Sequence, residues 1–211
     1  MKRVRCLTMS APMIRAYQAG LKWQTRRVVR PDLWPIFEES ARTNAGRASH
    51  QMLDFDVPCP YGEAGDELLL REPHKIEEVY PCGPHRMVRV RYLADDSVWD
   101  RELTMNEHAK LQARKYPLRA QPGRFMYRSL CRYRARLTRV RVERVQDIGC
   151  YDIRQEGVPC PVHTKGQCVD SCPSLLQAWE ILWDSINARR GFGWATNPWV
   201  WVLHFEPMEG E

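Results

Sequence analysis

The sequence of 211 residues predicts an α+β domain built around a small β-barrel or curled sheet. Stretches with the alternation of a strand outnumber those with the period of a helix, and the helical stretches lie between them. The last stretch, NPWVWVLHFEP at residues 197–207, is apolar on both faces, which is typical of a central buried strand. We expect a single domain, residues 1–211, with loops inserted between its elements and helices at its flanks.

The N-terminal part predicts two strands and one short helix. Residues 2–9 predict the first strand, and a serine cap followed by a proline predicts a helix that ends at Gly20. Residues 23–29, WQTRRVV, predict the second strand. Residues 31–62 show no sustained period and contain several prolines and glycines, so we expect a loop insertion there.

The middle of the chain predicts three further strands, at residues 65–72, 86–93 and 131–145. Arginines alternate with apolar residues in the last two strands. We therefore expect these arginines, among them Arg139 and Arg141, on a solvent-facing side where they could contact phosphates. Residues 100–128 are polar and irregular and form the second expected insertion, with one short helix from Met105 to Arg114.

The C-terminal part predicts two helices before the last strand. Residues 149–157 fit two helical turns closed by a glycine, and residues 158–173 form the third expected insertion. The strongest helix is expected at residues 174–191, with Ser174 as its cap and Gly191 at its end. Its expected apolar stripe consists of Leu176, Trp179, Leu182, Trp183 and Ile186.

The charge composition favours an anionic partner. The net charge is +6, and 26 of the 32 basic residues are arginine. The planar guanidinium pairs with phosphate and stacks on bases, so this excess is typical of a protein that binds a nucleoside or RNA, with DNA as a further alternative. Codon usage in a GC-rich genome would produce the same excess.

Neither an N-terminal apolar run of signal-peptide length nor a run of 18 apolar residues occurs in the sequence. We therefore expect a cytoplasmic protein without a membrane partner; the sequence carries no signal for an oligomeric state. The eight cysteines are then expected to be reduced, so a cluster of them indicates a metal site or burial before disulfides.

One such cluster lies in the third insertion. Cys160, His163, Cys168 and Cys172 follow the pattern C-x2-H-x4-C-x3-C, which is similar to a zinc knuckle in size and ligand type. A loop this short can surround one zinc ion tetrahedrally, and the metal would then stabilise a hydrophilic segment. The sequence therefore predicts one structural zinc. Two alternatives remain: burial of free thiols, and other ligands, namely Cys59, Cys82, His74 and His85.

Six stretches, ordered along the chain, resemble the ASCH-domain proteins that are common in phages and prophages. They are PMIRAYQAGLKWQTRRVV, CPYGEAGDELLLRE, LTRVRVERVQDI, RQEGV, LWDSIN and NPWVWVLHFE. The resemblance runs through nearly the whole chain and implies a PUA-like fold, a small pseudo-barrel associated with RNA and modified bases. Some bacterial relatives are amidohydrolases that remove the acetyl group from N4-acetylcytidine, and at least one relative has been described as a ribonuclease.

The resemblance also implies three catalytic residues. The amidohydrolases use a lysine, a threonine three residues later, and a glutamate in a short helix after the long strand. The matching positions here are Lys22, Thr25 and Glu156. This chain is much longer than the smallest amidohydrolases, and its insertions have no counterpart there, so the resemblance leaves the substrate open.

Amide hydrolysis needs a nucleophile, a base that takes its proton, and donors for the oxyanion. A neutral Lys22 amine could deprotonate the Thr25 hydroxyl, provided that burial or nearby cations lower the lysine pKa. Glu156 would orient the lysine or relay the proton to the leaving amine. Residues three apart in a regular strand face opposite sides, so the pair would need a turn at Gly20 that brings Lys22 over Thr25.

Trp23, Arg26 and Arg27 flank this pair and are the expected substrate-binding residues. The arginines could lower the lysine pKa or grip a phosphate. Two other functions fit the same pocket. One is a non-catalytic module that binds RNA or a modified base, with Lys22 solvated and Thr25 structural; the other is a ribonuclease. No organic cofactor is expected.

Overall fold

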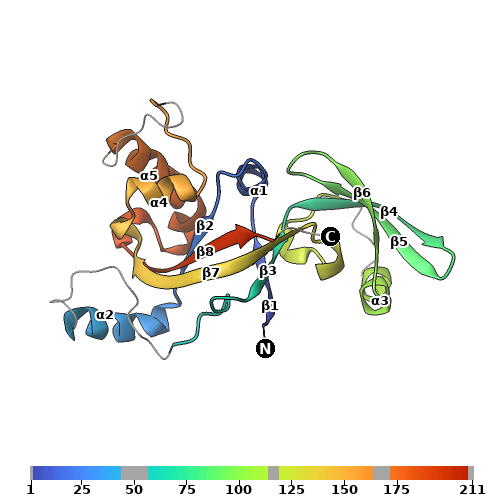
Figure 1. Cartoon of the computed structure of the whole chain (residues 1–211), viewed down its shortest axis with the longest axis horizontal. Coiled ribbons are helices and arrows are strands. Elements are labelled where there is room, and N and C mark those ends of the chain that lie inside the picture. The colour runs from blue at the N-terminus through green and yellow to red at the C-terminus, as the bar shows by residue number, and fades with distance from the viewer. Residues whose placement is uncertain (1, 44–56, 114–118, 164–171, 209–211) are drawn as a thin grey trace. The chain divides into compact units, whose positions relative to one another are not determined.

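The computed structural model describes residues 2–43, 57–113, 119–163 and 172–208. These residues form two compact units. The first comprises Met1–Ala19, Gly65–Arg136 and Glu206–Glu211, and the second comprises Gly20–Ala64 and Leu137–Phe205. Each unit contains both strands and helices, which confirms the α+β prediction (Figure 1).

The first unit contains two sets of paired strands. One set has the order β1-β3-β7, with β1 parallel to β3 and the beginning of β7 antiparallel to β3; the strands are Val4–Thr8, Glu67–Arg71 and Tyr133–Arg144. The other set is an antiparallel sheet of order β4-β5-β6, formed by His74–Cys82, His85–Tyr92 and Val98–Glu102. Two helices complete the unit, α1 at Ala11–Gln18 and α3 at Met105–Ala113.

The alternation in β5 is as the sequence predicts. Val88, Val90 and Tyr92 are fully buried and pack in one hydrophobic cluster with Met126 and Leu130. The arginines between them face outward, but carboxylates on the neighbouring strands and on the turn after β5 neutralise them. Arg89 pairs with Glu78 and Asp100, and Arg91 pairs with Glu77 and Asp96.

The sequence analysis did not find β4 and β6, the two edges of this sheet. Strand β4 ends among Pro81 and the glycine after it, and its outward face carries Glu77 and Glu78, so the segment lacks a simple alternating pattern. Strand β6 is short and largely exposed, and lies in the region expected to be irregular. Both strands depend on pairing with β5, which no local pattern reveals.

The second unit has the strand order β7-β8-β2, with β8 at Trp199–Pro207 between the other two and antiparallel to β2 at Gln24–Val28. Its helices are α2 at Trp34–Thr43, α4 at Cys150–Gln155 and α5 at Pro173–Asn187. Helices α4 and α5 lie side by side (Figure 1) and share a hydrophobic cluster with Val200 and Val202 of β8. The expectation of a central, buried last strand is therefore confirmed.

Helix α2 corrects the prediction of a loop from residue 31 onward. A 3-10 turn at Pro31–Leu33 leads directly into the helix. The prolines that suggested a loop lie in the first turns, where a missing N–H costs nothing. Phe37 is fully buried against the rings of Trp199 and Trp201, and this contact holds the helix on β8.

Helix α5 begins at Pro173, and its N-cap is Cys172, two residues before the predicted cap Ser174. Its buried face contains Leu175, Trp179 and Trp183, which follow one another at four-residue intervals. Two residues of the predicted stripe are exposed, Leu176 at 37% and Ile186 at 46%. The buried face of α5 is therefore shifted by about one residue from the predicted apolar stripe.

Among the described residues the strands form two sheets, and neither closes into a barrel. The barrel part of the fold prediction is therefore not confirmed. In the same residues, no helix has both the length and the apolar character needed to cross a lipid bilayer.

Candidate functional site

Lys22 and Glu156 are brought together by backbone and side chain alike. The two residues form an isolated antiparallel bridge just before β2, and the Trp23 N–H donates to the Gln155 carbonyl at 2.8 Å. The Lys22 side chain is fully buried, and its Nζ donates to Glu156 Oε2 at 2.9 Å and to the Glu156 carbonyl at 2.8 Å. Two of the three residues implied by the resemblance are thus in direct contact.

Arg26 of β2 completes this contact from the other side of Glu156. Its side chain is fully buried and donates through Nη1 to Glu156 Oε1 at 3.1 Å. Its Nε and Nη2 both reach Glu143 Oε1, at 3.0 and 2.6 Å, and Nη2 also reaches Asp152 Oδ2 at 2.9 Å. Every guanidinium nitrogen of Arg26 therefore contacts a carboxylate of the protein, and the group lies over the Trp179 ring.

Arg141 extends the network along β7. Its Nε donates to Glu143 Oε2 at 2.8 Å, and its other nitrogens contact Asp152 and His204. Arg141 is only 9% exposed, which corrects the expectation that it faces solvent. The alternation in β7 predicts that the valines face inward. The buried face is instead the one that carries Arg141 and Glu143, because α4 supplies a carboxylate that pairs with Arg141.

The charges in the network alter its proton affinities. Burial lowers the pKa of Lys22 below its ordinary value, although the adjacent Glu156 carboxylate opposes the shift. Burial also acts to lower the pKa of Arg26, but the surrounding carboxylates, led by Glu156, outweigh it and raise this pKa. Burial together with the Arg141 charge lowers the pKa of His204 to about 4. Of the two cations that hold Glu156, Lys22 therefore gives up its proton more readily than Arg26.

Thr25 is buried but is not bonded to Lys22. The contacts of Gln24 and Arg26 with Asp152 show that these residues face α4, so strand alternation directs Thr25 to the opposite side of β2. In the part of the chain that the structure describes, both hydrogen bonds of Lys22 Nζ go to Glu156. The turn at Gly20, whose φ is +65°, is present, but it aligns Lys22 with Glu156.

The other two expected binding residues lie beside Thr25. Trp23 is half-buried, and its Nε1 donates to the Gly20 carbonyl at 3.0 Å. Burial lowers the pKa of Arg27, which interacts electrostatically with Tyr61 and Glu156. Arg27 therefore contributes positive charge near the Lys22–Glu156 pair.

A second group of functional side chains lies between α4 and α5. The ligand atoms of Cys160, His163 and Cys172 all lie within 4.8 Å of one another, and the three residues could hold a metal ion. The fourth predicted ligand, Cys168, lies outside the described residues. The alternative ligands named above, Cys59, Cys82, His74 and His85, are not members of the group.

The spacing of these atoms fits tetrahedral coordination. With zinc–sulfur distances of about 2.3 Å and a zinc–nitrogen distance of about 2.0–2.1 Å, tetrahedral angles place two sulfurs about 3.8 Å apart and a sulfur and a nitrogen about 3.6 Å apart. The two Sγ atoms of Cys160 and Cys172 are 3.7 Å apart. His163 Nδ1 lies 3.3 Å from the first sulfur and 3.6 Å from the second. The donors are thus arranged for one ion, and the sulfurs are not bonded to each other.

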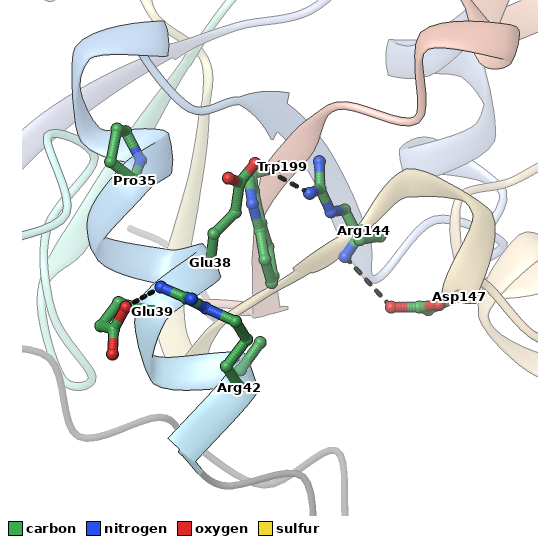
Figure 2. Close-up of a pocket in the computed structure, with 8 residues that line it drawn as sticks. Pro35, Glu38, Glu39, Arg42, Arg144, Asp147 and Trp199 are labelled. Atoms are coloured by element: carbon green, nitrogen blue, oxygen red, sulfur yellow. Dashed lines mark hydrogen bonds and ion pairs between the residues drawn. The ribbon is translucent and has the colours of Figure 1, made fainter.

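A pocket of about 690 Å³ lies at α2, away from the residues predicted by the sequence. Figure 2 shows Glu38 and Arg144 pointing toward each other beside Trp199. Arg144 Nη2 pairs with Glu38 at 3.1 Å, and the guanidinium stacks 4.5 Å from the Trp199 ring centroid. The remaining lining residues are Pro35, Glu39, Ala41, Arg42 and Asp147. Glu38 pairs with Arg144 and Glu39 with Arg42, whereas the Asp147 carboxylate accepts from the Arg144 backbone N–H, so the lining carries one net negative charge.

Sequence reasoning found Glu156 but missed the other two carboxylates that surround Arg26, Glu143 and Asp152. Asp152 lies four residues before Glu156, so a helical reading of residues 149–157 already places both on one face of α4. No sequence pattern indicated that Glu143 is buried, because it stands among arginines in a strand whose charged side is predicted to face solvent. Its partner on β2 becomes evident only from the sheet order.

The comparisons with known proteins add no relative. No family model matches the chain, and neither the curated proteins nor the solved structures contain a match.

Proposed function

We propose that this protein is an amidohydrolase that removes an acyl group from the exocyclic amine of a modified nucleobase, as in N4-acetylcytidine. The observation that carries the proposal is the fully buried Lys22 amine in contact with Glu156. A buried lysine whose pKa is lowered releases its proton more readily than an exposed one, which suits the role of a general base. The resemblance to ASCH-domain amidohydrolases supplies the substrate class.

In this mechanism the neutral Lys22 amine accepts the proton of the nucleophile. Glu156 holds the amine through Oε2 and is itself held by Arg26 through Oε1. Thr25 is the nucleophile that the resemblance implies; because its side chain lies on the other side of β2, its use requires Lys22 to leave Glu156 for part of the cycle. A water molecule activated by Lys22 is the alternative nucleophile.

The test is hydrolysis of N4-acetylcytidine, with cleavage of RNA assayed in parallel. We expect release of acetate by the unaltered protein, a rate that rises with pH through the lowered lysine pKa, and loss of activity in Lys22→Met. Lys110→Met, which changes an exposed lysine on α3, is the matched control. Nucleoside binding without turnover would favour the binding module, and cleavage of RNA alone would favour the ribonuclease.

Kinship with the PUA-like ASCH proteins, a phage or prophage origin and a cytoplasmic location belong to the same proposal. They rest on the ordered motifs that resemble those proteins. Nucleoside or RNA as partner rests on the arginine excess and the resemblance.

We further propose that the cysteine–histidine group binds one structural zinc, with Cys168 as the fourth ligand. The tetrahedral spacing of Cys160, His163 and Cys172 supports it. Elemental analysis of protein made without an affinity tag should find about one zinc per chain. Cys172→Ser should lose the metal, whereas Cys82→Ser, at an exposed cysteine on β4, should keep it. A fully folded protein free of metal would contradict the proposal.

A further inference from the structure

The metal-ligand group and the Lys22–Glu156 pair are joined by a very short segment of chain. Helix α4 ends at Gln155 with Glu156 as its C-cap, Gly157 turns the chain with a φ of +80°, and Val158 is buried before Cys160 is reached. The Val158 N–H donates to the Ile153 carbonyl at 3.4 Å. The segment between the Glu156 backbone and the first metal ligand, Cys160, is therefore short and has little conformational freedom.

Cys172, the other cysteine ligand, is linked to the Lys22–Glu156 pair through α5. Cys172 is the N-cap of α5, and its carbonyl accepts a weak hydrogen bond from Cys150 Sγ at the start of α4, at 3.7 Å. Two turns further along α5, Trp179 lies under the Arg26 guanidinium, 5.8 Å from it. Arg26 in turn holds Glu156 Oε1.

These contacts join α4, α5 and the segment between them in one packed cluster. Cys150, Ile153, Val158, Cys172 and Trp179 belong to a single hydrophobic cluster, and Cys160 packs against it. An ion that joins Cys160 to Cys172 would fix the end of α4 relative to the start of α5. The contacts that the three donors make with one another are thiol and imidazole contacts, which are weak compared with bonds to a metal ion.

We infer that metal bound by Cys160, His163 and Cys172 positions Glu156 against Lys22. The metal centre thereby controls whether the lysine amine stays buried and paired. The inference rests on the proposed metal site, and it deepens the proposed function by giving that site a positioning role for the Lys22–Glu156 pair.

The test measures the burial of Lys22 directly. Zinc-loaded protein and protein stripped with a chelator are acetylated with an amine-reactive ester, and the modification of each lysine is followed by mass spectrometry. With zinc, Lys22 should react at least tenfold more slowly than the exposed Lys110. After stripping, the Lys22 rate should rise toward the Lys110 rate, and its protection should return in proportion to zinc occupancy.

Two variants of His163 distinguish the loss of a metal ligand from the loss of the imidazole side chain itself. His163→Ala should behave like stripped protein. His163→Cys, which keeps a zinc ligand at the position, should restore protection of Lys22. Cys82→Ser, the matched cysteine control in the other unit, should behave like the unaltered protein.

Three results would overturn the inference. They are failure to bind zinc, Lys22 protection that does not change with zinc occupancy, and loss of hydrogen-exchange protection in the β4-β5-β6 sheet on stripping, which would show that the metal supports the whole fold. Zinc-dependent protection of Lys22 without any deacylation would reject the proposed function and leave this inference intact.

Discussion

Three carboxylates surround the buried Arg26 guanidinium, and Lys22 and Arg141 complete a network of three cations and three anions. The charges balance only when Lys22 is protonated. In the neutral state required of a base, Lys22 faces one unmatched negative charge, which favours uptake of a proton from the nucleophile. Burial and ion pairing thus act in opposite directions on the pKa of the same amine, and this opposition would suit the proton transfer that we propose for Lys22.

Replacing Arg26 by methionine should be strongly destabilising. The variant leaves the buried carboxylates of Glu143 and Glu156 with one cation each, Arg141 and Lys22, and removing one partner from a buried ion pair costs about 3–5 kcal/mol. Urea unfolding measures the free energy change. Arg139→Met is the control at an exposed arginine of the same strand as Glu143, and equal effects of the two variants would contradict the buried role of Arg26.

The stability of the protein should also depend on pH through His204. Its pKa is about 4 in the folded protein, against an ordinary value of 6.5, because of burial and the Arg141 charge. Between these two values the unfolded chain binds more protons than the folded chain. The free energy of unfolding should therefore fall as the pH is lowered from 6.5 to 4.

His204→Gln should make that fall shallower, whereas His108→Gln on α3 should leave it unchanged. Unfolding by urea at a series of pH values provides the measurement. A variant with the same pH dependence as the unaltered protein would show that His204 is not the group responsible.

At the scale of the element, two adjacent leucines of α5 distinguish the observed helix face from the predicted one. Leu175 is fully buried, whereas Leu176 is 37% exposed. Leu175→Ala should destabilise the protein by about 2–5 kcal/mol, because it opens a cavity in the cluster beneath α5. Leu176→Ala should cost well under half as much. Thermal or urea unfolding of the two variants measures both losses of stability. A larger loss in Leu176→Ala than in Leu175→Ala would support the predicted stripe instead.

The elements that the sequence predicts well are those with their own periodic signal. Strand β5, with Val88 and Val90 inside, and helix α4, closed by Gly157, lie where the sequence places them. Helix α2 was missed because prolines in its first turns suggested a loop, and its anchor Phe37 finds its partners only on β8. Strands β4 and β6 were missed because pairing with β5 stabilises them more than their own residues do.

At the scale of the whole molecule, the net charge of +6 overstates the positive charge available to a nucleic acid. Arg89 and Arg91 on β5, and Arg26 and Arg141 in the second unit, are each paired with two or more carboxylates. Exposed arginines without such pairs, such as Arg139 on β7, are better placed to meet a phosphate. Composition alone therefore cannot locate an RNA-binding face.

For RNA binding we expect the two kinds of arginine to differ in their salt dependence. Arg139→Gln should reduce the slope of log affinity against log salt by about one unit, because one phosphate contact is lost. Arg89→Gln should leave the slope nearly unchanged, since Glu78 and Asp100 already neutralise this side chain. Fluorescence anisotropy of a labelled RNA over a series of salt concentrations measures both slopes. A larger effect of Arg89→Gln would contradict the pairing seen on β5.

The sequence by itself determined the α+β class and the buried last strand, because periodicity is a local property. It also placed three candidate metal ligands close together, since Cys160, His163 and Cys172 lie within thirteen residues of one another. Only the tertiary structure decided that Lys22 pairs with Glu156 across 134 positions, and that Thr25 faces away. The burial that lowers the Lys22 pKa and the carboxylates that surround Arg26 come from different elements, and packing alone brings them together.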